Sequence, residues 1–116
     1  MEKQQQVETI NKSRYGFVYR WRRGIMLQIE FGNMLLNYDT DNFRLFARLV
    51  QHIDTETDED IFYTHTRRPF LIYPLGSCAQ TYCFSRDEIM DLKVLLNGAI
   101  SMLDLQKSLR NNLIMN

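Results

Sequence analysis

Apolar and polar residues alternate along the first third of the chain. Every second residue is aromatic from Tyr15 to Trp21, and a similar alternation follows over residues 25–31 and 34–38. A period of two residues is typical of a β-strand with one buried face. A glycine stands in each of the two gaps, where it allows the tight turn of a hairpin. The pattern therefore predicts three antiparallel strands in succession.

The first of these strands, over residues 14–21, has two contrasting faces. One face holds Tyr15, Phe17, Tyr19 and Trp21, and the other holds Arg14, Gly16, Val18 and Arg20. Burial of a large aromatic ring contributes about 2 kcal/mol to stability. We therefore expect the aromatic face to lie inward, beneath helical cover. Its partners in the next strand are then Ile25, Leu27, Ile29 and Phe31.

The period changes to that of a helix after the third strand. Either Asp39 or Thr40 can cap the start of this helix. Its apolar residues at helical spacing are Phe43, Phe46, Leu49, Val50 and Ile53.

The second half of the chain predicts strands over residues 61–67, 70–73 and 80–84. A long helix should then begin at Arg86 and run to about residue 113. Ser85 and Glu88 have the spacing of a capping box, in which each satisfies a backbone amide of the other.

The order of these elements predicts an α+β fold, with a mostly antiparallel sheet of about six strands and two helices on one face. Both halves follow the order strand, strand, strand, cap, helix. Superposing Asp39 on Ser85 aligns the apolar positions of the two helices, as a βββα duplication would, although any two amphipathic helices give a similar match. We expect one domain over residues 14–116, preceded by a flexible, polar arm over residues 1–13.

Two segments, EFGNMLLNYDTDNFRLFARLV and GSCAQTYCFSRDEIMDLKVLL, resemble a small family of uncharacterised bacterial proteins. The shared features are an FGN turn before an apolar strand, a capped helix with spaced phenylalanines, and FS-x-x-E at the start of a leucine-rich helix. The resemblance covers most of residues 15–105 and implies no activity. Members often have a cysteine pair in the first hairpin. This chain has YRWR there, over residues 19–22, which puts any metal or redox role in doubt.

The overall composition narrows the classes of function. A chain of 116 residues with 45% apolar content fits one globular domain. No apolar run is long enough to span a bilayer, the N-terminus has no apolar secretory segment, and two cysteines are too few for a disulfide framework. We therefore expect a cytoplasmic protein with no membrane partner. Its 14 basic and 14 acidic residues cancel, so no overall field attracts it to DNA.

The first strand is a candidate surface for single-stranded nucleic acid. Such surfaces combine exposed rings that stack on bases with arginines that contact phosphates. The candidate contacts are Arg20, Trp21, Arg22 and Arg23, with Tyr15, Phe17 and Tyr19 as further rings. Binding requires the aromatic face to point outward. The zero net charge instead favours a core strand whose arginines face solvent.

Metal and catalytic sites have weaker support. The four residues that could form a metal set are Cys78, Cys83, His52 and His65. Their spacing does not match the close pairs of a zinc site, so we expect no metal and no other cofactor. The acidic stretch over residues 54–60 lacks the glycine of a calcium loop. No nucleophile–base pair or phosphate-binding loop stands out, which argues against an enzyme.

The long C-terminal helix has two apolar stripes, more than a helix on a small sheet buries alone. The first stripe, which should cover the sheet, consists of Ile89, Leu92, Leu96, Ala99 and Leu103. The second consists of Leu95, Met102, Leu105 and Leu109. The N-terminal arm could cover this second stripe, but we favour a homodimer contact in which Gly98 permits close approach. The sequence thus predicts a non-catalytic protein-interaction or regulatory module that acts as a homodimer, with nucleic-acid binding as the alternative.

Overall fold

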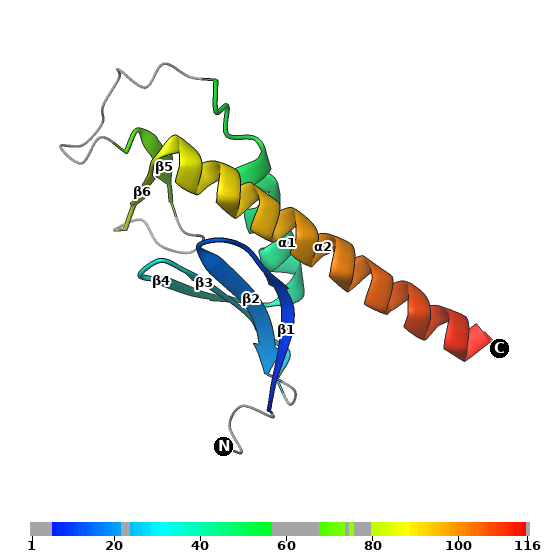
Figure 1. Cartoon of the computed structure of the whole chain (residues 1–116). Helices are drawn as coiled ribbons and strands as arrows, with labels where there is room; N and C mark the ends of the chain where they lie inside the picture. The colour runs from blue at the N-terminus through cyan, green and yellow to red at the C-terminus, as the bar shows by residue number, and fades with distance from the viewer. Residues whose placement is uncertain (1–5, 22–23, 57–67, 74, 76–79, 116) are drawn as a thin grey trace.

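A computed structural model shows a four-stranded sheet, a two-stranded sheet and two helices (Figure 1). It describes residues 6–21, 24–56, 68–73, 75 and 80–115. In chain order the elements are β1 (Val7–Lys12), β2 (Gly16–Trp21), β3 (Leu27–Phe31), β4 (Met34–Tyr38), α1 (Thr40–Gln51), β5 (Phe70–Ile72), β6 (Tyr82–Phe84) and α2 (Arg86–Met115). All described strand pairs are antiparallel. The predicted α+β fold with six strands and two helices is confirmed.

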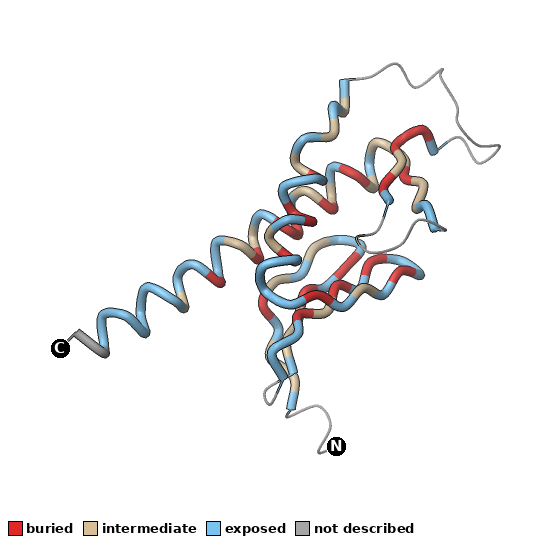
Figure 2. The backbone as a smooth tube through the Cα atoms, turned by 180° about the vertical axis from the view of Figure 1, so that it is seen from behind, coloured by how far each residue is buried: buried red, intermediate tan, exposed pale blue. Residues whose placement is uncertain are grey.

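Both helices lie on the same face of the four-stranded sheet (Figure 1). The core fills the space between the helices and the sheet. The side chains of Val18, Leu27 and Ile29 point from the sheet into this core and are completely buried. Phe43 and Phe46 of α1 meet them from the helical side. The second half of α2 extends beyond the core, and its exposed turns are visible in Figure 2. No helix in the described part of the chain is both long and apolar enough to span a membrane.

The predicted helix caps are confirmed. The Asp39 side chain accepts a hydrogen bond from the Asn42 backbone N–H at 2.8 Å, which caps α1. At α2 the Ser85 N–H donates to Glu88 Oε1 at 2.8 Å, and the Glu88 N–H donates to Ser85 Oγ at 3.2 Å. Burial alone would raise the pKa of Glu88. The hydrogen bonds from Ser85 and Arg68 and the Arg68 charge outweigh burial and lower that pKa below its ordinary value.

The prediction for the faces of β2 is wrong. Cross-strand pairs place Gly16 opposite Phe31 and Val18 opposite Ile29, so the even-numbered residues of β2 face the core. The aromatic row points to the other side. A shift of one residue in strand register moves every side chain to the opposite face, and the observed hairpin differs by one residue from the expected one.

Residues 7–12 are part of the sheet, so the flexible arm cannot extend over residues 1–13 as predicted. They form the edge strand β1, which pairs with β2 and has a bulge between Thr9 and Asn11. The Asn11 side chain donates to the Leu95 carbonyl at 2.9 Å, and Ser13 Oγ donates to Asp91 at 2.7 Å. Asp91 also accepts the backbone N–H groups of the next two residues at 3.2 and 3.0 Å. Helix α2 therefore holds β1 and the turn after it.

Only part of the predicted internal duplication can be compared with the structure. Four strands rather than three precede α1. The strand expected over residues 61–67 lies outside the described residues, so the repeat stays a prediction. The two strands described before α2, β5 and β6, form a separate small sheet.

Candidate functional site

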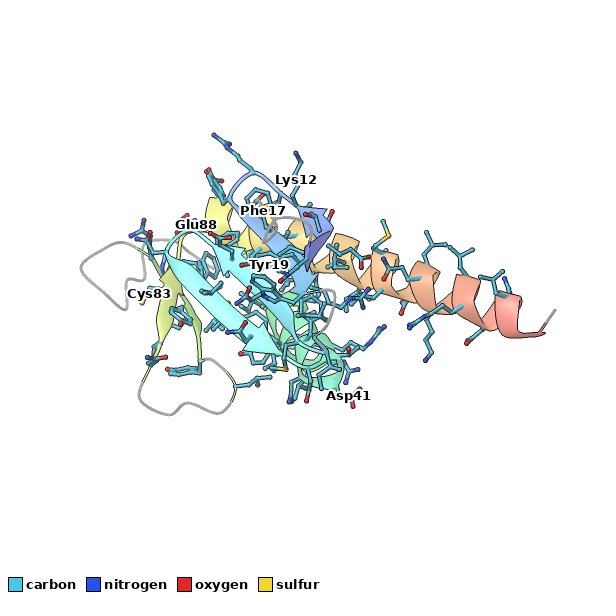
Figure 3. The ribbon with its side chains drawn as sticks, turned by 90° about the horizontal axis from the view of Figure 1, so that it is seen from below. Lys12, Phe17, Tyr19, Asp41, Cys83 and Glu88 are labelled. Atoms are coloured by element: carbon cyan, nitrogen blue, oxygen red, sulfur yellow. The ribbon has the colours of Figure 1, made fainter. Side chains whose placement is uncertain are left out.

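The face of the four-stranded sheet away from the helices carries the aromatic row. We call it the outer sheet face and define it by Val7, Thr9, Lys12, Phe17, Tyr19, Trp21, Gln28, Glu30, Leu35 and Asn37. Figure 3 views the molecule from below and shows Phe17 and Tyr19 on this face. Phe17 is 46% exposed and Trp21 is 38% exposed. No described segment covers these rings, which are therefore available to a partner.

Polar residues flank Phe17 and Tyr19 on both sides, whereas the apolar Val7 lies opposite Trp21 on β1. In the sheet register Phe17 lies between Lys12 of β1 and Glu30 of β3. The Trp21 indole N–H donates to Gln28 Oε1 at 3.0 Å, which fixes the orientation of that ring. Burial, and secondly the charge of Glu30, raise the pKa of Tyr19 above its ordinary value. The face therefore combines apolar rings with one charge of each sign.

The structure separates the residues predicted to contact nucleic acid. Trp21 lies on the outer sheet face, but Arg20 points to the opposite side. Its guanidinium donates to Glu8 at 3.2 Å and to Gln106 of α2 at 2.9 Å. Arg22 and Arg23 lie outside the described residues. Arg20 is thus removed from the candidate surface.

Tyr15 also leaves the row, because its ring packs edge-on against the core residue Phe31, with 6.2 Å between centroids. The guanidinium of Arg14 lies 5.1 Å from the centroid of the Tyr15 ring. The remaining row consists of Phe17, Tyr19 and Trp21.

A second exposed surface lies on the projecting part of α2. We call it the α2 stripe and define it by Met102, Leu105, Leu109 and Leu113, all of which are exposed. Three of these residues belong to the predicted dimer contact. The fourth predicted residue, Leu95, is completely buried in the core and cannot contribute to a surface. The spacing of three and four residues keeps the four side chains on one side of the helix.

Gly98 has a different role from the one predicted. A Cβ at this position would collide with the side chain of Asn11, which occupies the space next to the glycine. The close approach that Gly98 permits is therefore between α2 and β1 of the same chain.

The proposed metal set is not assembled in the described structure. Cys83 is a half-buried free cysteine, and His52 ends α1 with its Nδ1 atom 2.7 Å from the Arg48 carbonyl oxygen. Cys78 and His65 lie outside the described residues. Within the described ranges, no three histidine, cysteine or acidic side chains lie close enough to share a metal ion.

Sequence reasoning missed several members of these surfaces. Lys12, Gln28, Glu30 and Leu35 join the outer sheet face only once the strand register is known, because alternation alone does not tell which face is buried. Leu113 follows Leu109 at the same spacing that relates Leu109 to Leu105. That periodicity was available in the sequence and extends the α2 stripe by one turn.

The amino-acid sequence matches that of a protein family over nearly its whole length. Searches among curated proteins and among solved structures give no match. The model of one family, described as a family of unknown function (DUF6686), matches residues 1–115. The chain therefore belongs to the DUF6686 family.

Proposed function

We propose that the chain is a non-catalytic interaction module of the cytoplasm that forms a homodimer through the α2 stripe. The observation that carries the proposal is the extension of α2 beyond Leu103, the last buried residue among those of the helix whose burial the structure describes. No described part of the chain covers the stripe on this extension. Figure 1 shows the end of the helix standing clear of both sheets.

A helical extension of this kind favours a partner for two reasons. The extension continues a helix that is already formed over the core, but packing supplies most of the stability of protein helices, and the exposed stripe packs against no described segment. A row of exposed leucines also gains free energy when it leaves water. A second copy offers the same row, which is the requirement for a two-fold interface.

The spacing of the α2 stripe suits an antiparallel pair. A two-fold axis near residue 107 would place Leu105 against Leu109 of the partner subunit. The same axis would place Met102 against Leu113 of the partner subunit. Four side chains from each copy make a small interface, so we expect a dimer that dissociates on dilution.

Sedimentation equilibrium over a range of concentrations tests the proposal. The wild-type chain should associate to a dimer, and Leu105→Glu should weaken association at least tenfold, because it places a carboxylate in the centre of the contact. Met90→Glu is the matched control, since Met90 and Leu105 are both 53% exposed on the same helix. A monomeric wild-type chain, or equal association of the two variants, would contradict the proposal.

A second candidate function is binding of single-stranded nucleic acid by the outer sheet face. It is favoured by one observation, the outward orientation of Phe17, Tyr19 and Trp21. Bases stack on such rings with a free energy of about 1 to 3 kcal/mol each. The other face of the sheet is already occupied by the helices, so binding would not disturb the core.

The fluorescence of Trp21, the single tryptophan, reports directly on this candidate. We expect an oligonucleotide to quench it, with weaker binding at higher salt. Phe17→Ala should weaken binding about tenfold through the loss of one stacking ring. Tyr73→Leu removes an exposed ring elsewhere and is the control. If the wild-type chain and Phe17→Ala bind the oligonucleotide equally well, the binding is due to electrostatic attraction alone and the candidate function is excluded.

A further inference from the structure

We infer that the outer sheet face orients a single-stranded nucleic acid with its phosphates over β1 and its base edges over β3, and that Glu30 selects bases carrying an amino group. The inference rests on the second candidate function and adds the direction of the strand and a base preference. It follows from the positions of three rings and of the charges on either side of them.

The three residues of the aromatic row are attached to β2 at a regular interval. Phe17, Tyr19 and Trp21 are alternate residues of β2, so the Cα atoms of successive residues lie about 6.8 Å apart along the strand. A base stacked between two rings needs about 3.4 Å on each side, the spacing of stacked bases in DNA. The interval between the points where neighbouring rings are attached therefore leaves room for one base between them.

The charges beside the row differ between its two sides. Lys12 pairs with Phe17 from the β1 side, and Figure 3 shows both residues on the same part of the sheet. Arg14 lies in the turn between β1 and β2 and is also exposed. On the β3 side Phe17 is paired with Glu30, which is exposed as well. Phosphates are attracted to the cationic side and repelled from the acidic side, which fixes where the backbone of the ligand runs.

A carboxylate on the base side discriminates between pyrimidines. The Glu30 carboxylate can only accept hydrogen bonds, so it can pair with the amino group at position 4 of cytosine. Uracil has a carbonyl oxygen at that position, and two acceptors repel. The expected preference for cytosine over uracil is about tenfold, the low end of the discrimination given by a good polar contact with a base edge.

The competing occupant of this face is a protein. One charge of each sign around a group of aromatic side chains also suits a protein interface. Such a partner has no need of a regular interval between rings or of a phosphate on the β1 side. It predicts that oligonucleotides bind without any effect of the rings, or not at all.

The test measures Trp21 quenching by oligo(C) and oligo(U) of equal length, with the full chain and with Glu30→Gln. We expect oligo(C) to bind the wild-type chain about tenfold more tightly than oligo(U). The preference should disappear in Glu30→Gln, because an amide both donates and accepts hydrogen bonds. Glu56→Gln, a change of the same kind at an exposed residue of a loop, should keep the preference.

The outcomes separate this inference from the candidate function beneath it. If neither oligo(C) nor oligo(U) binds, both this inference and the candidate function are overturned. Binding that depends on Phe17 but is equal for oligo(C) and oligo(U) overturns only the role of Glu30. A cytosine preference that survives Glu30→Gln also overturns that role, and circular dichroism of the variant confirms that it is folded.

Discussion

A Gly16→Val variant is expected to lose about 3 kcal/mol of unfolding free energy, the cost of severe overpacking in a core. A Cβ on Gly16 would lie 2.5 Å from the Glu30 carbonyl oxygen and 2.8 Å from a ring carbon of Phe31. It would also lie 3.1 Å from a methyl group of Leu95 on α2. The nearest of these atoms belongs to the backbone of β3 and cannot rotate away. The sheet or the helix has to move, and chemical denaturation measures the cost.

Gly32→Ala is the control that separates lack of space from backbone conformation. Gly32 has a φ of 58°, in the left-handed region, but a Cβ there would meet no atom within 4 Å. Its replacement should cost only about 1 kcal/mol of conformational strain. Equal losses in the two variants would contradict the steric argument for Gly16.

Leu95→Ala is expected to reduce the unfolding free energy by about 3 kcal/mol, as truncation of a buried leucine does when a cavity remains. Leu95 has no exposed surface and packs in the core between α2 and the sheet. The same variant should leave dimerisation unchanged once it is folded, because this side chain does not reach the α2 stripe. Denaturation and sedimentation of one sample measure the two effects separately.

Leu105→Ala provides the opposite result. Leu105 is 53% exposed, so its truncation should change the stability of the isolated chain by about 0.5 kcal/mol or less. Association should weaken instead. If Leu95→Ala weakened the dimer while leaving stability intact, the assignment of Leu95 to the core would be wrong.

Local chemistry made part of the fold predictable from the sequence. Asp39 and Ser85 each begin a helix, and their hydrogen bonds depend on residues only three positions away. The hairpins from β2 to β4 were likewise predictable, because alternation and turn residues are short-range signals. Such signals predict where elements begin and end but not which face of a strand meets the rest of the molecule.

The face of β2 was not predictable because the deciding interactions are distant. Gly16 is a core position because α2 and β3 come too close for a side chain, which composition does not reveal. Arg20 is tolerated on the inner side because Glu8 and Gln106 bind its guanidinium at the end of the sheet. The face of β2 with the aromatic side chains was therefore predicted to lie in the core, although it faces outward.

The same long-range contacts explain why β1 was taken for an arm. Ile10 is the only residue of β1 that is buried in the core, and most of the other side chains of this strand are polar. Besides its pairing with β2, this strand is held by hydrogen bonds to α2, which lies far along the chain. The α2 stripe was largely predictable, because its periodicity is visible in the sequence. Only the burial of Leu95 required the packed structure.

The contacts between β1 and α2 also determine when the protein can fold during its synthesis. Asn11 and Leu95 are separated by 84 positions, and Glu8 and Gln106 by 98. The first strand is therefore synthesised well before the residues of α2 that contact it. Closure of the domain has to wait until α2 has been translated, so folding cannot be completed progressively from the N-terminal strands alone.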